Sequence, residues 1–306
     1  MQPGRIVSLL PGATEIIAAL GLGERLVGIS AQCDAPASVM NRPRLSLAAL
    51  DPGETDPAAI DRSVRARLAA GEPLFQADAK ALRALRPDLI VSQSLCDVCA
   101  ATPGSLTAEA IGTAQVLALD GRDLDGLLED IRQLARAAGV AGRGEQLIGE
   151  LSRRREAVER QPPGRQRVLS VEWPAPLFIG GHWLPDMVKS AGGEPLGAPG
   201  DHSVEVDWER ILAFDPEVIV MLPCGQSLEA AARGLDALRG RPGWAGLSAV
   251  RQGAVYVADG NRFFSRPGPG AFTGLEIMAC ILGASTTDPA PGYWRRARAT
   301  EIAPGR

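Results

Sequence analysis

The chain has 306 residues, which is long enough for two lobes of ordinary domain size that each bury a hydrophobic core. Its hydrophobic fraction of 45% is typical of a soluble globular protein, and a net charge of −4 with scattered basic residues argues against nucleic acid as a partner. No run reaches the ~18 apolar residues of a membrane span, and the apolar run IVSLL stops too early for a signal peptide. We therefore expect a cytoplasmic protein without membrane insertion.

Short β-branched runs alternate with amphipathic stretches in the first part of the chain. RIVSLL (5–10) and RLVGIS (25–30) are predicted strands, and ATEIIAALG between them is a predicted helix. LFQADAKALRALRP leads as a helix into the strand DLIVSQ (88–93), and AQVLAL (114–119) is a further strand. Alternating strands and helices predict a parallel sheet with right-handed crossovers, so we assign residues 1–122 to one α/β lobe.

A wholly helical stretch separates this lobe from the rest of the chain. It runs from residue 123 to about residue 160, and a Pro-Pro-Gly run ends it, which predicts a helical bridge over 123–164. RVLSVEW (167–173) restarts the alternation and predicts a second α/β lobe over 165–286, followed by a loop-rich tail over 287–306. LRALRPDLIVSQ is echoed by ILAFDPEVIVML, which favours two similar lobes facing each other across a cleft.

Cysteines follow several of these predicted strands. Cys33 comes three residues after RLVGIS, Cys224 follows EVIVMLP, and Cys96 and Cys99 form a C-x-x-C directly behind DLIVSQ. Ligands of open parallel sheets bind at the loops that leave the carboxyl ends of the strands, so we expect these four thiols at the edge of the cleft. Cys280 has apolar neighbours and is predicted to be a packed core thiol.

Three kinds of site fit the C-x-x-C of Cys96 and Cys99. A redox pair needs the second cysteine inside a helix, but Pro103 and Gly104 leave such a helix little room. Two unrelated structural thiols are the plain alternative. Four thiolates from separate loops suit tetrahedral zinc or an iron–sulfur cluster, and the absence of a zinc-ribbon spacing favours the cluster slightly.

Other side chains near strand ends are candidates for contact with a ligand. His182 opens the helix LPDMVKSAGG, where it can donate to a sulfur or to a substrate, whereas His202 is expected on the surface. PGATE presents backbone N–H groups but matches no nucleotide-binding motif. Aromatic rings that follow strands can stack on a flat ligand. The expected ligand-binding residues are His182, Trp183, Trp173, Pro11, Gly12, Phe263 and Phe264.

The opening RIVSLLPGATEIIAALGLGERLVGIS resembles that of the vitamin-B12- and iron-siderophore-binding proteins of ABC importers. The resemblance extends from Arg5 to about Gly283. It implies two Rossmann-like α/β lobes joined by one long backbone helix, with the ligand cleft between them, and an ABC permease as a partner. It also implies a binding protein rather than an enzyme.

A narrower group, generally labelled cobalamin-binding and usually lacking signal peptides, is similar in CDAP, LCDVCA, GGHWLPDM, MLPCG and FSRPGPG. The usual motif of that group, Ser-His-Glu-Cys-Asp-Tyr-Pro, reads SAQCDAP here. Ala31, Gln32 and Ala35 therefore depart from the pattern, which puts in doubt any role that rests on that His or Tyr.

We predict a two-lobed binding protein with a thiolate-ligated metal centre in the cleft, preferably an iron–sulfur cluster rather than zinc. Its ligands would be Cys33, Cys96, Cys99 and Cys224. Two alternatives stay open. One is a cobalamin- or corrinoid-binding ABC substrate-binding protein, and the other is a dithiol oxidoreductase that uses Cys96 and Cys99.

Overall fold

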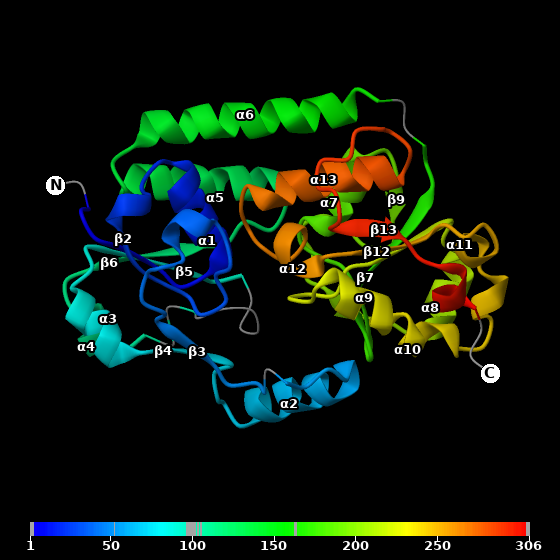
Figure 1. Ribbon diagram of the computed structural model, residues 1–306, viewed down its shortest axis with the longest axis horizontal. Coiled ribbons are helices and arrows are strands. Elements are labelled where there is room, and N and C mark those ends of the chain that lie inside the picture. The colour runs from blue at the N-terminus through cyan, green and yellow to red at the C-terminus, as the bar shows by residue number, and fades with distance from the viewer. Residues whose placement is uncertain are drawn as a thin grey trace.

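Two lobes lie side by side, each built on a largely parallel sheet, and a pair of helices runs along both (Figure 1). The computed structural model describes residues 3–51, 53–95, 102, 104, 106–161 and 164–303, except for the side chains of residues 47 and 48. Within those ranges, no helix has the length and apolar character needed to cross a membrane.

The N-terminal lobe is built on a four-stranded parallel sheet in the order β2-β1-β5-β6. Its strands are β1 (Ile6–Ser8), β2 (Leu26–Ile29), β5 (Leu89–Gln93) and β6 (Gln115–Leu119), so the four strands predicted for this lobe are confirmed. All residues of β1 and β5 are buried, as is typical of central parallel strands. Its helices are α1 (Pro11–Ala19), α2 (Pro57–Ala69), α3 (Ala79–Leu85), α4 (Ala108–Ile111), η1 (Gly23–Arg25) and η2 (Ala37–Val39).

A small antiparallel pair, β3 (Ser46–Ala48) and β4 (Phe75–Ala77), stands apart from this sheet and carries α2 between its strands. Neither strand was predicted, because runs of three residues are too short for an alternating pattern to be recognised. The helix expected from LFQADAKALRALRP is therefore wrong over Phe75–Ala77, which form β4, and begins only at Ala79.

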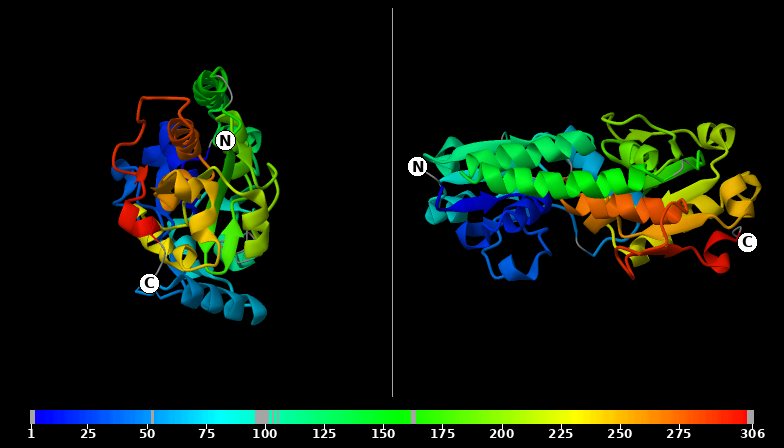
Figure 2. Two further views of the ribbon diagram at one scale, coloured as in Figure 1. Left: turned by 90° about the vertical axis from the view of Figure 1, so that its right-hand side faces the viewer. Right: turned by 90° about the horizontal axis from the view of Figure 1, so that it is seen from above.

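The bridge consists of two antiparallel helices, α5 (Leu124–Ala137) and α6 (Ala141–Glu159). Gly139 ends α5 with φ +73°, a left-handed conformation that favours glycine. Helix α6, the long backbone helix, has 19 residues and is therefore about 28 Å long. Seen from above in Figure 2, it extends from one lobe over the other.

The C-terminal lobe is built on a sheet in the order β10-β8-β7-β11-β12-β13, with β9 paired to β7. Strands β7, β11 and β12 are parallel, whereas β8, β10 and β13 are antiparallel to their neighbours. The strands are β7 (Arg167–Pro174), β8 (Leu177–Ile179), β9 (Glu194–Pro195), β10 (Val204–Glu205), β11 (Val218–Met221), β12 (Val255–Ala258) and β13 (Trp294–Arg296). The helices are α7 (Leu184–Ser190), α8 (Trp208–Phe214), α9 (Leu228–Gly234), α10 (Asp236–Arg239), η4 (Trp244–Gly246), α11 (Ser248–Arg251), α12 (Gly260–Phe263), α13 (Gly270–Ile281) and α14 (Ala299–Ile302).

The segment after residue 286 differs from the expected loop-rich tail. Trp294–Arg296 forms the edge strand β13, and the Trp244 indole donates a hydrogen bond to the Ile302 carbonyl at 2.9 Å. The sequence WRRAR has no period-2 pattern, so only its pairing with β12 makes it a strand.

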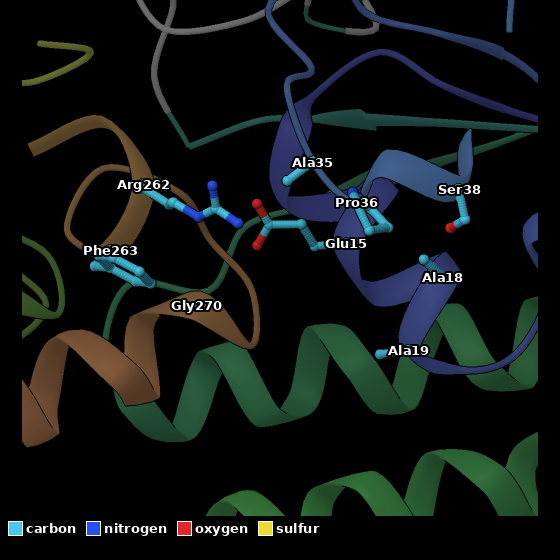
Figure 3. A pocket seen from close by; sticks show the side chains of 9 residues that line it. All are labelled: Glu15, Ala18, Ala19, Ala35, Pro36, Ser38, Arg262, Phe263 and Gly270. Atoms are coloured by element: carbon cyan, nitrogen blue, oxygen red, sulfur yellow. The ribbon is translucent and has the colours of Figure 1, made fainter. Parts of the chain in front are cut away.

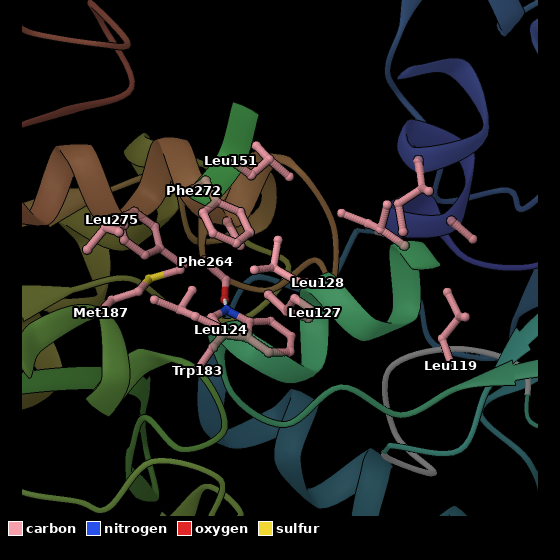
Figure 4. Packing of buried hydrophobic residues seen from close by; sticks show 14 of the residues in the cluster. Leu119, Leu124, Leu127, Leu128, Leu151, Trp183, Met187, Phe264, Phe272 and Leu275 are labelled. Carbon is pink, nitrogen blue, oxygen red and sulfur yellow. Dashed lines mark hydrogen bonds between the residues drawn. The ribbon is translucent and has the colours of Figure 1, made fainter. Parts of the chain in front are cut away.

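The two lobes share one hydrophobic core along α5 (Figure 4). Leu124 and Leu127 of α5 pack in the same cluster as Trp183, Phe264 and Phe272 of the C-terminal lobe. The buried Trp183 indole donates a hydrogen bond to the Phe264 carbonyl at 2.9 Å. We call this contact the α5 seam. Because interiors are close-packed, separation of the lobes along the seam would expose apolar surface.

The chain crosses from β6 to α5 beside a buried carboxylate, that of Asp130. Its side chain accepts hydrogen bonds from the Asp120 and Gly121 backbone N–H groups at 3.1 and 2.9 Å. Burial raises the pKa of Asp130 from 3.8 to about 6, although those two hydrogen bonds oppose the shift.

This raised pKa predicts a measurable pH dependence of stability. Between pH 3.8 and about 6 the folded protein holds a proton on Asp130 that the unfolded chain has lost. The stabilisation that this proton provides is fully present below pH 3.8 and is lost as the pH rises through about 6. Between pH 4.5 and 7.5 the parent should lose about 2 kcal/mol of unfolding free energy relative to Asp130→Asn. Urea denaturation of both proteins across this range tests the prediction, and a pH-independent difference would contradict it.

Candidate functional site

The carboxyl ends of the strands in one lobe face those of the other lobe. The loop after β2 contacts α12, the short helix that follows β12, since the Asn261 amide donates a hydrogen bond to Asp34 at 3.1 Å. The loop after β6 contacts the loop before β10, where Arg122 Nη1 lies 3.4 Å from His202 Nε2. We call these contacts the first and second rim. Open α/β sheets bind ligands at such carboxyl-end crevices, so the space between the rims is the candidate site.

At the first rim, the buried guanidinium of Arg266 joins the lobes. Arg266 lies between α12 and α13 and is 3% exposed. It donates two hydrogen bonds to the Asp34 carboxylate at 2.6 and 2.7 Å and one to Glu15 at 3.0 Å. Two parallel N–H···O bonds are the strong, oriented form of an arginine–carboxylate pair. We call these three residues the Arg266 clasp.

The two carboxylates of the clasp differ electrostatically. Burial raises the pKa of Glu15, and the charge and hydrogen bond of Arg266 offset this only in part. Burial also acts on Asp34, but the hydrogen bonds and charge of Arg266 outweigh it and hold the pKa of Asp34 below its usual value. Asp34 is therefore the firmly ionised partner of the guanidinium.

A pocket of about 470 Å³ lies beside the clasp and is lined by both lobes (Figure 3). Glu15 and Arg262 point toward each other across it. Phe263, one of the predicted ligand contacts, forms part of its apolar wall. The complete lining is Glu15, Ala18, Ala19, Ala35, Pro36, Ser38, Arg262, Phe263 and Gly270.

The only two histidines of the sequence are in ring contact at the second rim. The ring centroids of His182 and His202 lie 5.4 Å apart, edge to face. Within the part of the chain that the structure describes, Nε2 of His182 is buried and has no hydrogen-bond partner. Burial, and then the charges of His202 and Arg122, lower the pKa of His182 to about 4. His182 is therefore a neutral imidazole with an unbonded nitrogen, whereas His202 is exposed, as expected.

The remaining predicted ligand contacts have other partners in this structure. The half-buried Trp173 donates its indole N–H to the Pro57 carbonyl of α2 at 3.1 Å. Trp183 and Phe264 are 4% and 2% exposed and pack in the α5 seam rather than along an open wall. Pro11 begins α1. Gly12 packs against Pro267, whose carbonyl oxygen would lie 2.2 Å from any Cβ at that position.

The cysteines behind the strands do not form a metal site within the described part of the chain. Cys33 is buried, its Sγ lies 3.1 Å from Thr14 Oγ1, and burial raises the pKa of its thiol. Cys224 is half-buried behind β11, whereas Cys96 and Cys99 lie outside the described residues. No group of three or more His, Cys, Asp or Glu residues suited to a metal ion occurs among the described residues. The four-thiolate centre therefore stays a prediction.

Cys280, expected to be a packed core thiol, is half-buried, and its Sγ donates to the Thr287 carbonyl at 3.1 Å. It lies in the last turn of α13, between the buried residues Ala279 and Ile281.

The clasp is not predicted by the sequence analysis. Asp34 belongs to CDAP and Arg266 to FSRPGPG, but from these two motifs only Cys33 and Phe264 are predicted to be site residues. Asp34 and Arg266 are 232 positions apart, and no local pattern pairs residues at that separation.

The clasp predicts a large cost for removing its cation. Arg266→Met leaves two carboxylates without their shared partner, so the free energy of unfolding should fall by about 3 kcal/mol. The matched control is Arg132→Met, which removes a more exposed guanidinium from its pair with Glu145 and should cost less than about 1 kcal/mol. Equal losses in chemical denaturation would show that the clasp does not stabilise the fold.

Comparison with known proteins gives consistent matches over most of the chain. The family model described as periplasmic binding protein matches residues 6–261. A curated relative, an uncharacterized ABC transporter substrate-binding lipoprotein YvrC of Bacillus subtilis (strain 168), is 22% identical over 292 residues, covering 91% of this chain and 79% of the relative.

Solved structures give the same result for the fold. A possible iron-binding (periplasmic solute-binding) protein from Staphylococcus epidermidis superposes with TM-score 0.69 at 19% identity, covering 92% of this chain and 99% of the other. The periplasmic vitamin B12 binding protein BtuF of Vibrio cholerae has TM-score 0.63 at 21% identity, with coverage of 92% and 97%. A periplasmic heme binding protein from Pseudomonas aeruginosa has TM-score 0.67 at 22% identity, with coverage of 93% and 94%.

These matches contradict the expectation of a cytoplasmic protein. The matching family is described as periplasmic, and the curated relative is a lipoprotein. The expectation rested on the shortness of one apolar run before Pro11, which carries no information about where the folded chain works.

Proposed function

The chain belongs to the periplasmic binding protein family, and from that membership we propose that it delivers a corrinoid or a haem to an ABC-type permease. The ligand would lie between the two rims, in contact with both lobes. The proposed ligand class therefore includes the cobalamin predicted as an alternative from the sequence, together with other metal-containing tetrapyrroles.

The observation that carries this proposal is the state of His182. A neutral imidazole nitrogen is a common ligand of iron and other transition metals, and a pKa of about 4 leaves it unprotonated at neutral pH. No donor among the described residues bonds Nε2 of His182, so its lone pair is not used by a hydrogen bond to them. Because that atom is buried, a bound metal reaches it only if neighbouring side chains such as the exposed His202 move.

The pocket at the first rim suits the rest of such a ligand. Ala18, Pro36 and Phe263 offer apolar surface to a flat macrocycle, and Arg262 offers a cation to its carboxylate or amide edge. Solved proteins of this fold are named for vitamin B12 and for haem, which supports the same ligand class.

Titration with haemin and with hydroxocobalamin, followed by absorbance, tests the proposal. We expect saturable binding of at least one of them. His182→Asn, chosen because asparagine tolerates the φ of +53° at this position, should weaken that binding at least about tenfold. It should also remove the absorbance change due to imidazole ligation. His202→Asn is the matched control and should keep that change.

Two results would overturn the assignment. One is the absence of binding of either compound at high micromolar concentration, and the other is equal affinity and equal spectra for the parent and His182→Asn.

A second experiment separates this proposal from the thiolate centre. Tetrapyrrole binding should survive Cys224→Ser as well as Cys280→Ser, because neither thiol is needed for it. Protein purified without oxygen should then carry far less than one acid-labile sulfide per chain, whereas a bound haem would bring iron without sulfide. Stoichiometric iron and sulfide that Cys224→Ser loses and Cys280→Ser keeps would establish the thiolate centre in its place.

A further inference from the structure

Helix α2 belongs to the N-terminal lobe in sequence but lies against the C-terminal lobe. It leaves and rejoins its own lobe through β3 and β4, which pair along their whole length. None of its residues is buried. Figure 1 shows it on the opposite side of the molecule from α5 and α6, with one end close to the end of β7.

In the described part of the chain, α2 contacts three different strands of the C-terminal lobe. The Trp173 indole at the end of β7 donates to the Pro57 carbonyl at 3.1 Å. Arg65 forms an ion pair with Glu205 of β10 at 2.8 Å, and its guanidinium lies 6.0 Å from the ring centroid of Phe178 in β8. Helix α2 therefore lies across the carboxyl end of β7, which is a central strand of the sheet and faces the space between the rims.

These contacts are weak compared with those on the other side of the molecule. The side chains of Arg65 and Glu205 are 53% and 51% exposed, and ion pairs this exposed contribute little and are screened by salt. Along the α5 seam, by contrast, the lobes share a hydrophobic core. The side of the cleft covered by α2 is therefore the one that opens most readily.

We propose that α2 is a lid over the ligand cleft, anchored by the β3–β4 pair and latched to the C-terminal lobe by Arg65 and Trp173. Detachment of α2 exposes Trp173 and the centre of the cleft, and its return covers a molecule that has entered. The identity of that molecule rests on the proposed function. The motion of the lid does not, because it belongs to the free protein.

A measurement without ligand tests the lid itself. Glu205→Gln removes the ion pair to Arg65, so the Trp173 indole should become more accessible to acrylamide, a neutral quencher. The contribution of Trp173 is isolated by subtracting the fluorescence of Trp173→Phe in the same background. We expect its quenching constant to rise at least about twofold.

Glu72→Gln is the matched control. Glu72 pairs with Arg67 of α2 at 2.9 Å and forms no ion pair with the C-terminal lobe among the described residues, so its loss should leave the quenching of Trp173 unchanged. Added NaCl should raise the quenching in the parent but not further in Glu205→Gln.

Ligand kinetics give a second readout in the same variants. A lid that makes the same contacts over an empty and a filled cleft changes access but not affinity. For haemin or hydroxocobalamin, Glu205→Gln should therefore raise the association and dissociation rates together, with Kd kept within about twofold. If the parent binds neither compound, the proposed function fails, and the quenching result alone decides the lid. If Glu205→Gln matches Glu72→Gln in quenching, α2 is not a lid.

Discussion

The arrangement of the two lobes depends on the need to pair the buried charge of Arg266. Without its partners, a guanidinium that is 3% exposed would carry a large desolvation cost. Both of its carboxylate partners, Asp34 and Glu15, belong to the other lobe, so the cation is satisfied only while the lobes are together. The same closeness allows the backbone of Gly12 to lie against Pro267 and lets both lobes line one pocket.

The contacts between the lobes differ in polarity on the two sides of the molecule. The α5 seam is apolar and continuous with the cores of both lobes, whereas the contacts of α2 are polar and exposed. Apolar contacts of this kind hold two bodies in one arrangement, and exposed ion pairs exchange readily with water. The molecule therefore joins its lobes by apolar packing on one side and by exposed polar contacts on the other.

The central parallel strands could be predicted from the sequence, because apolar runs such as DLIVSQ are typical of buried parallel strands. The short strands β3, β4 and β13 could not. The loops that form the site could be predicted too, because the carboxyl ends of parallel strands gather at one edge. The side chains that meet there could not. Trp183 is hydrogen-bonded to Phe264, which lies 81 positions further along the chain, so its packing could not be predicted from local sequence. Arg266 and Asp34 are separated by even more residues. The prediction of a cytoplasmic protein was wrong, because that prediction rested on one short apolar run rather than on the family of the chain.

A tetrapyrrole bound between the lobes would be in contact with both of them. Hydrogen–deuterium exchange with and without haemin or hydroxocobalamin measures this contact. We expect slower exchange on both sides of the cleft, at residues 34–38 and 120–123 of the N-terminal lobe and at 181–183 and 260–266 of the C-terminal lobe. Protection confined to one lobe, or no protection at a saturating concentration of either compound, would contradict it.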